Sequence, residues 1–302
     1  MSVEIVHGAG PARVDIAYER FGDPGAPPVL LVMGLATQML GWPEEFCSAL
    51  AGHGLQVIRF DNRDVGLSSH CHDAPPPDVP AALAGDTSSA SYTLSDMALD
   101  TVGLLDALKV PSAHIVGASM GGMIAQTIAI EHPERVRSLT SIMSTTGDDR
   151  VGQSTQAALA ALLSPPASTR EEAIERTVSV FRVIGSPGFE LDEAGLRERA
   201  GIAYDRAYDP PGVARQLVAI RASGDRTARL RAVDVPALVI HGADDPLVDV
   251  SGGRATAHAL PGAELVVFDG MGHDLPRPLW PELTARIAAH VERAEASARS
   301  CG

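Results

Sequence analysis

The sequence is short of basic side chains, and this shortage excludes one class of partner. Its 24 lysines and arginines stand against 38 acidic residues, which gives a formal net charge of −14. Nucleic-acid binding depends on a positively charged surface that neutralises phosphates. The balance therefore argues against a nucleic-acid partner. It is usual for a soluble enzyme and says nothing about the substrate.

Cysteines and long apolar runs are also scarce. The three cysteines, Cys47, Cys71 and Cys301, are odd in number and irregularly spaced, which does not fit a disulfide framework. No apolar run approaches the roughly 18 residues that a membrane span needs. The first ten residues show no basic segment followed by an apolar one, so no signal peptide is expected. We therefore expect a protein of the reducing cytoplasm with no membrane partner.

Aromatic residues make up only 4% of the 302 residues, whereas 45% are hydrophobic. A core of leucine, valine, isoleucine and alanine is therefore expected. The length suits one large α/β domain, or a core with an inserted subdomain.

The segment Gly117-Ala118-Ser119-Met120-Gly121 has the Gly-x-Ser-x-Gly pattern of a nucleophile elbow. Apolar residues precede it and an apolar helical pattern follows, which predicts a strand, a sharp turn and a helix. Glycines two positions either side of the serine avoid a clash in such a turn. The helix start directs backbone N–H groups to the same place. A solvent-exposed turn is the alternative, but the context favours Ser119 as a nucleophile.

Strand and helix patterns alternate along most of the chain, which predicts a mostly parallel sheet covered by helices on both faces. Residues 14–20 alternate apolar and polar, which indicates a strand with one wet face. A proline-, alanine- and serine-rich stretch, 75–91, is read as a surface connection. Thr93 and Asp96 form a predicted capping box at the start of a core-facing helix. Buried strands are expected at 28–33, 57–60, 114–116, 138–143, 237–240 and 264–268.

The strand signal vanishes between about residues 148 and 226, where helical patterns are broken by proline and glycine. This composition predicts a helical cap inserted over the elbow. The expected organisation is a first core segment (1–147), the cap (148–226) and a second core segment (227–302).

A serine nucleophile needs a base within hydrogen-bond reach, and the base needs an orienting carboxylate. The expected chain order is serine, acid, histidine. His273 lies in a glycine-flanked loop after the last predicted strand and is the predicted base. His241 precedes the acid candidates, and His258 and His290 fall inside predicted helices and are read as surface residues.

The acid is expected in the loop after the strand that ends at Ile240. Asp244 and Asp245 compete for this role. Pro246 fixes the backbone beside Asp245, which favours Asp245 as the acid. Asp244 is then a turn-capping residue or one that supports the site from outside.

Two other polar clusters are given structural roles. Asp61 and Arg63 are interpreted as charges that brace the loop after the strand at 57–60. The run His70-Cys71-His72-Asp73 looks like a set of metal ligands, but zinc sites normally need four ligands and no second cluster follows. It is read as the rim of a pocket, and no metal and no cofactor are expected.

These features together resemble the α/β-hydrolase superfamily over nearly the whole chain. Four segments are similar to its aclacinomycin methylesterase branch, which cleaves a methyl ester on an anthracycline polyketide, and to esterases that open macrolide lactones. They are 30–34 (Leu-Leu-Val-Met-Gly), 41–46 (Gly-Trp-Pro-Glu-Glu-Phe), 57–64 (Val-Ile-Arg-Phe-Asp-Asn-Arg-Asp) and 261–273, which ends in Gly-Met-Gly-His.

The resemblance implies an α/β-hydrolase fold with Ser119 as nucleophile, Asp245 as acid and His273 as base. It also implies the backbone N–H groups of Leu35 and Met120 as donors of an oxyanion hole. Many relatives carry His-Gly where this chain has Met33-Gly34, but the N–H geometry needs only the glycine. An ordinary strand-to-helix turn is the alternative reading of this loop.

The expected activity is cofactor-free hydrolysis of a carboxylic ester through an acyl-enzyme on Ser119. The apolar cap suggests a small hydrophobic ester as the partner, such as a macrolide, another polyketide ester or a lipid. A thioesterase, a C–C bond hydrolase and a cofactor-free perhydrolase use the same residues and stay open, as does a non-enzymatic ligand receptor. Epoxide hydrolases and dehalogenases of this fold carry aspartate at the elbow, so Ser119 argues against both. The sequence does not predict the oligomeric state.

Overall fold

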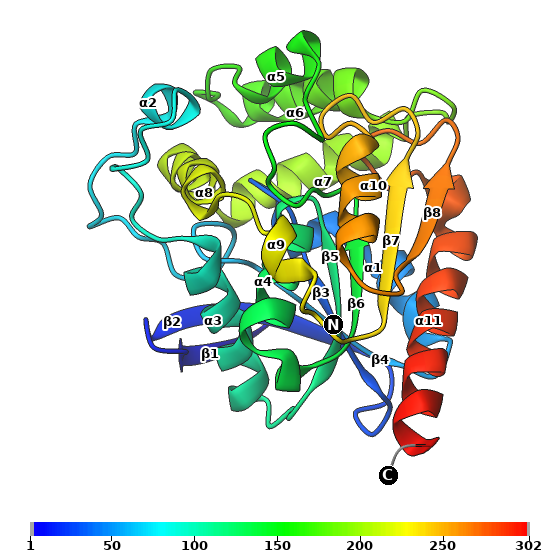
Figure 1. Cartoon of the computed structure of the whole chain (residues 1–302). Coiled ribbons are helices and arrows are strands. Elements are labelled where there is room, and N and C mark those ends of the chain that lie inside the picture. The colour runs from blue at the N-terminus through cyan, green and yellow to red at the C-terminus, as the bar shows by residue number, and fades with distance from the viewer. Residues whose placement is uncertain (1–2, 301–302) are drawn as a thin grey trace.

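An eight-stranded sheet, in the order β1-β2-β4-β3-β5-β6-β7-β8, forms the centre of the computed structural model, which describes residues 3–300 (Figure 1). β1 pairs antiparallel with β2, and β2 pairs antiparallel with β4. The pairs from β4 through β3, β5, β6 and β7 to β8 are parallel, which confirms the predicted α/β class. The strands are β1 (Glu4–Ala9), β2 (Val14–Phe21), β3 (Pro28–Val32), β4 (Gln56–Phe60), β5 (Ala113–Ala118), β6 (Val136–Ile142), β7 (Ala237–Gly242) and β8 (Glu264–Phe268).

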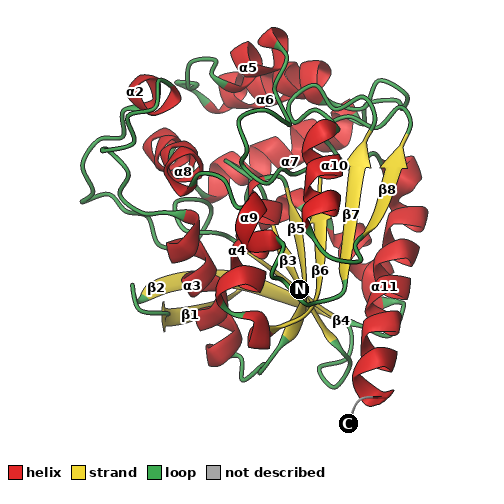
Figure 2. Cartoon of the chain, in the orientation of Figure 1, coloured by secondary structure: helices red, strands yellow, loops and turns green. Residues whose placement is uncertain are grey.

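Helices cover both faces of this sheet, as Figure 2 shows. One face carries α3 (Leu94–Ala107), α4 (Met120–Glu131) and α10 (Ser251–Ala259), and the other carries α1 (Glu44–Ala51) and α11 (Trp280–Ser300). The predicted capping box of α3 is present. Short 3₁₀ turns lie at Met39–Gly41 (η1), Pro133–Arg135 (η2) and Arg277–Leu279 (η3).

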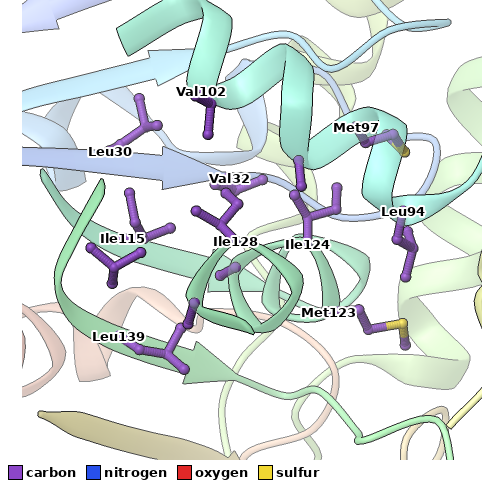
Figure 3. Close-up of a cluster of buried hydrophobic side chains, with 14 of the residues drawn as sticks. Leu30, Val32, Leu94, Met97, Val102, Ile115, Met123, Ile124, Ile128 and Leu139 are labelled. Atoms are coloured by element: carbon purple, nitrogen blue, oxygen red, sulfur yellow. The ribbon is translucent and has the colours of Figure 1, made fainter. Parts of the chain in front are cut away.

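The central strands divide their side chains between two hydrophobic cores because successive residues of a strand point to opposite faces. Leu30 and Val32 of β3 pack with Ile124 and Ile128 of α4 on one face (Figure 3). Val29 and Leu31 of the same strand belong to the core on the other face. Each such side chain, fully buried, contributes roughly 1.5–3 kcal/mol relative to an exposed one. The two cores hold β3 and β5 in place beneath the elbow.

A run of helices fills the chain between β6 and β7. It comprises α5 (Gln156–Leu162), α6 (Arg170–Ile184), α7 (Glu193–Arg206), α8 (Pro210–Ser223) and the short α9 (Thr227–Leu230). Figure 1 places α5 to α8 at the end of the sheet toward which the parallel strands point. A small buried cluster joins Ala158 and Ile184 of these helices to Leu247 of the loop after β7.

The structure corrects three sequence expectations. β2 does not have one solvent-exposed face, because Glu19 is buried in an ion pair with Arg59 of β4. The 75–91 connection contains a short helix, α2 (Val79–Leu83), whose Ala81 N–H is capped by Asp78. His290 is buried rather than a surface residue, and burial lowers the pKa of its imidazole.

Cys47 and Cys71 are free thiols, and Cys301 lies outside the described residues. Within residues 3–300, every helix falls short of the combined length and apolarity needed to cross a bilayer.

Candidate active site

Ser119 occupies the turn between β5 and α4 in a strained backbone conformation. Its φ of 56° and ψ of −121° lie in a region that residues with a side chain rarely adopt. A Cβ atom added to Gly117 would lie 2.1 Å from the carbonyl oxygen of Gly121, and one added to Gly121 would lie 2.1 Å from that of Val32. Only glycine fits at either position. The two glycines therefore allow the tight turn that presents the serine at the end of the sheet.

His273 contacts Ser119 from the loop after β8. Its Nε2 lies 3.0 Å from Oγ of Ser119, and its Nδ1 lies 2.7 Å from Oδ2 of Asp245. Asp245 comes from the loop after β7, so three separate strand ends supply the three side chains. The imidazole thus bridges a hydroxyl and a carboxylate, which is the arrangement in which it can accept the serine proton.

Asp245 is buried and held on both carboxylate oxygens. Its Oδ1 accepts hydrogen bonds of 2.9 Å from the N–H groups of Leu247 and Val248. Burial raises the pKa of Asp245, but the His273 charge and the hydrogen bonds from His241, His273 and Val248 outweigh it and hold the pKa below its ordinary value. The carboxylate is therefore ionised beside the imidazole at neutral pH.

Asp244, the competing acid, has a different role. Its Oδ2 accepts the N–H of Gly270 at 2.8 Å, and its own N–H donates to the carbonyl of Met271. It ties the loop after β7 to the loop that carries His273. These contacts agree with the turn-capping role predicted from the sequence for Asp244 if Asp245 is the acid.

The two predicted oxyanion donors belong to residues next to the serine turn: Met120 follows Ser119 in the chain, and Leu35 follows Gly34, which packs against it. Met120 is the first residue of α4, where a helix N–H has no partner in the helix itself. Gly34 packs against the serine from the loop after β3, because a Cβ added to it would lie 3.1 Å from Cβ of Ser119. Within residues 3–300, Leu35 N–H makes no hydrogen bond, whereas the next N–H, of Ala36, donates to Gln216.

Comparison with known proteins agrees with this architecture. The sequence profile of the alpha/beta hydrolase fold matches residues 27–276. The chain belongs to the alpha/beta hydrolase fold family.

Curated relatives of this hydrolase include two named methylesterases. Rhodomycin D methylesterase DnrP of Streptomyces peucetius is 32% identical, and rhodomycin D methylesterase DauP of Streptomyces sp. (strain C5) is 33% identical. Each match covers 93% of this chain and 96% of the relative. Among solved structures, a hydrolase from Pseudomonas aeruginosa PA01 is similar in fold, with a TM-score of 0.69 and 24% identity over 97% of this chain and 98% of the other.

The loop of this hydrolase that carries His273 packs backbone to backbone against the end of α6. His273 N–H donates to the carbonyl of Ile184 at 2.7 Å. A Cβ on Gly272 would lie 2.3 Å from the carbonyl oxygen of Gly185, and one on Gly188 would lie 2.6 Å from Cα of Gly270. This glycine seam, formed by residues 185, 188, 270 and 272, lets the histidine loop and the helical segment touch without side chains between them.

Sequence reasoning missed several residues around the site. His241 of β7 lies beside Asp245, and Gln216 of α8 contacts the loop after β3. Ser186 donates a hydrogen bond to Asp274, the residue after His273. Burial raises the pKa of the Asp274 carboxyl group. The roles of Gln216 and Ser186 appear only in space, because their partners lie on distant segments of the chain. His241 lies only four residues before Asp245, but no motif marks it as a neighbour of the carboxylate.

The bracing role read for Asp61 and Arg63 agrees with their hydrogen bonds. Asp61 accepts the N–H groups of Met39 and Leu67. Arg63 pairs with Asp100 of α3. These contacts fix the loop after β4 to its surroundings and leave neither side chain in contact with Ser119.

One group of side chains in the described chain could hold a metal ion. His70, His72 and Asp209 bring their ligand atoms within 4.8 Å of one another. Both ring nitrogens of His70 are already paired, with Asp209 at 2.7 Å and the carbonyl of Gly66 at 3.0 Å. The same oxygen of Asp209 lies 3.3 Å from the Arg215 guanidinium, which competes with a cation. This group therefore fits a link between the loop after β4 and α8 better than a metal centre.

A pocket of about 390 Å³ lies beside the histidine loop. Pro246 and Asp274, the chain neighbours of Asp245 and His273, line it together with Phe181 and Phe189. Ser119 is not among its lining residues. The pocket therefore borders the acid and histidine loops rather than the serine hydroxyl.

Proposed function

We propose that this alpha/beta hydrolase cleaves carboxylic ester bonds through a serine nucleophile, without a cofactor. One observation carries the proposal: the His273 imidazole lies 3.0 Å from the Ser119 hydroxyl and 2.7 Å from the Asp245 carboxylate. The methylesterase relatives, similar over nearly their whole length, support an ester as the substrate class.

In the proposed mechanism, Ser119 Oγ attacks the ester carbonyl carbon while His273 Nε2 takes its proton. Asp245 holds the Nδ1–H tautomer and stabilises the imidazolium that forms. The tetrahedral intermediate collapses as the carbon–alkoxy bond breaks, and His273 gives its proton to the leaving alcohol. Water then attacks the acyl-enzyme by the same route in reverse, which releases the acid and restores Ser119.

The developing oxyanion is held by the N–H groups of Leu35 and Met120. The unpaired Leu35 N–H and the start of α4 support this assignment, since such donors act where charge appears in the transition state. Ala36 is not a candidate, because its N–H already donates to Gln216 at 3.0 Å.

We further propose that residues 148–226 act as a cap over the elbow, between core segments 1–147 and 227–302. The position of α5 to α8 at the carboxyl end of the sheet supports this role (Figure 1). The names of the methylesterase relatives support a methyl ester as the substrate. We propose that a bulky polyketide carries this ester, with a macrolide lactone as the alternative.

Ser119→Ala tests the nucleophile. We expect hydrolysis of p-nitrophenyl butyrate to fall by about 10⁴-fold or more, because the triad residues act as a unit. Ser297→Ala, on the exposed end of α11, serves as the control and should retain full turnover. A fluorophosphonate probe should label the parent at Ser119 and leave Ser119→Ala unlabelled. Undiminished turnover in a folded Ser119→Ala protein would refute the proposal.

The substrate class needs a separate comparison. The same protein is offered five kinds of substrate: methyl esters, macrolide lactones, acyl-CoA thioesters, vinylogous diketones, and peroxide with acetate. Products are followed by mass spectrometry. Fastest turnover of the methyl esters or lactones is expected. A preference for one of the last three would replace the esterase with a thioesterase, a C–C bond hydrolase or a perhydrolase.

A further inference from the structure

The loop after β3, which packs against Ser119 at Gly34, carries three consecutive N–H groups, from Leu35, Ala36 and Thr37. Thr37 N–H bonds back to the carbonyl of Gly34 at 3.3 Å. Ala36 N–H donates to Oε1 of Gln216 at 3.0 Å. Within the described chain, Leu35 N–H is thus the one of the three without a hydrogen bond. Leu35 N–H is therefore the donor that this loop can offer to a ligand.

Gln216 is fully buried and its amide orientation is fixed by its two neighbours. Ala36 N–H can only donate, so it must face the amide oxygen. The carbonyl of Arg63 can only accept, and it lies 2.8 Å from Nε2 of the same amide. The exposed fraction of Gln216 is 0%, so water does not compete for either bond. A single side chain of α8 therefore joins the loop after β3 to the loop after β4.

The loop after β3 is also tied to α7. Nε2 of Gln38 donates to the carbonyls of Ala203, at 2.7 Å, and Ala207, at 3.1 Å. Arg206 Nε in turn donates to Oε1 of Gln38 at 2.8 Å. Ala36, which binds Gln216 and lies two residues before Gln38, has a φ of 62°, which costs energy for a residue with a side chain. The strained conformation is maintained from outside the loop, by helices of the segment between β6 and β7.

We propose that Gln216 is a positioning residue for ester hydrolysis: by binding the Ala36 N–H, it orients the preceding peptide so that Leu35 N–H faces the oxyanion. The inference rests on the proposed function of Ser119. It assigns to α8 a part in forming the oxyanion hole, beyond covering the site. Gln216 itself touches neither the hydroxyl of Ser119 nor the reacting carbonyl.

Gln216→Leu tests this role, because leucine keeps most of the volume and removes both hydrogen bonds. Loss of a complete oxyanion donor lowers kcat by about 10²–10³-fold. A misplaced donor should cost less, so kcat for p-nitrophenyl butyrate is expected to fall about 10- to 100-fold, with KM changed by less than about threefold. The inhibition constant of a trifluoromethyl ketone, whose adduct with serine carries an oxyanion, should rise in parallel with the fall in kcat/KM.

Gln126→Leu is the matched control. Gln126 is an equally buried glutamine on α4, bonded to Ser141 and Arg226 rather than to the loop after β3. The Gln126→Leu variant shows how much stability is lost when a buried amide is removed away from the site. Its kcat should stay within about threefold of that of the parent.

Gln216→Glu adds a readout that a purely structural role would not move. The protonated carboxyl group has the same donor and acceptor pattern as the amide, whereas the carboxylate faces the Arg63 carbonyl without a proton to share. The ratio of the kcat of Gln216→Glu to that of the parent should therefore rise as the pH is lowered and the carboxylate gains a proton. Using the ratio cancels the effect of His273 protonation, which is common to both proteins.

A kcat of folded Gln216→Leu equal to that of Gln126→Leu, or an effect confined to KM, would overturn the inference. If Gln216→Leu does not fold, a pH-independent ratio for Gln216→Glu would overturn it and a rising ratio would support it. Turnover that survives Ser119→Ala would instead refute the proposed function. An inactive Ser119→Ala protein beside an unaffected Gln216→Leu protein removes only the role of Gln216.

Discussion

His241 places its Nε2 3.5 Å from Oδ2 of Asp245, the carboxylate oxygen that also lies 2.7 Å from His273 Nδ1. The same Nε2 lies 2.7 Å from the carbonyl of Val248. Both histidines are buried, so two imidazoles flank one carboxylate oxygen away from water. The Asp245 carboxylate is thus held by its own loop and by the strand that precedes it, which fixes its direction toward His273.

Asp245→Asn should lower kcat by about 10⁴-fold while it leaves the protein folded, because an amide cannot hold the imidazole in the required tautomer. Asp244→Asn is the matched control, since the Asp244 side chain accepts only the Gly270 N–H. The amide oxygen preserves that acceptor, so kcat should change little. Steady-state kinetics with p-nitrophenyl butyrate compare the two. Equal losses in both proteins would contradict the choice of Asp245 as the acid.

The lowered pKa of Asp245 also predicts how stability depends on pH. A carboxyl group with a depressed folded-state pKa stabilises the protein above its unfolded-state pKa, about 3.9, and this contribution is lost as the pH falls through the folded-state pKa. The difference in unfolding free energy between the parent and Asp245→Asn should therefore shrink from about pH 5 to about pH 3. Urea denaturation at both pH values measures it. A difference that grows on acidification would contradict the sign of the shift.

Gly121→Ala should destabilise the protein by about 3 kcal/mol or more, because the new methyl group would overlap the Val32 carbonyl. Gly25→Ala is the control: its nearest neighbour would be Asp23 Oδ1 at 3.5 Å, an ordinary contact. That change should stay within about 0.5 kcal/mol. Urea unfolding midpoints give both values. A Gly121→Ala protein as stable as the parent would show that the elbow can open without cost.

Arg215→Leu should destabilise the protein by about 3 kcal/mol, because it leaves the buried Asp64 carboxylate without its guanidinium partner. The Arg215 and Asp64 side chains are 3% and 0% exposed. Arg197→Leu, which removes exposed pairs with Glu175 and Glu193, should barely change stability, since water screens such pairs. Thermal unfolding compares the two variants. Similar melting temperatures would mean that the link between α8 and the core contributes little.

The sequence predicts those parts of the site whose causes are local. The clash that forbids a side chain at position 117 comes from Gly121, four residues away, so the elbow pattern is readable in one short segment. The positions of Asp245 and His273 follow from chain order, since each lies in a loop after a recognisable strand. In the structure His273 lies 3.0 Å from Ser119 Oγ, and Asp245 lies 2.7 Å from His273.

The remaining contacts join segments whose separation leaves no local pattern. Gln216 lies 180 residues from Ala36, and Arg215 lies 151 residues from Asp64. Sequence periodicity also misplaced His290, because a helical residue is buried or exposed according to what its helix packs on. The strand β1 was missed since its side chains are mostly exposed or half-buried and give no apolar pattern.

The glycine seam between the histidine loop and the end of α6 limits how this enzyme can be recombined with its relatives. A chimera that exchanges the helices between β6 and β7 inserts new backbone against residues 270 and 272, where even one methyl group is too large. The donor segment must therefore supply a glycine at the position of Gly188, where a Cβ atom would lie 2.6 Å from Cα of Gly270. The recipient must keep Gly272, because a Cβ atom there would meet the backbone carbonyl at position 185, whichever residue the donor carries.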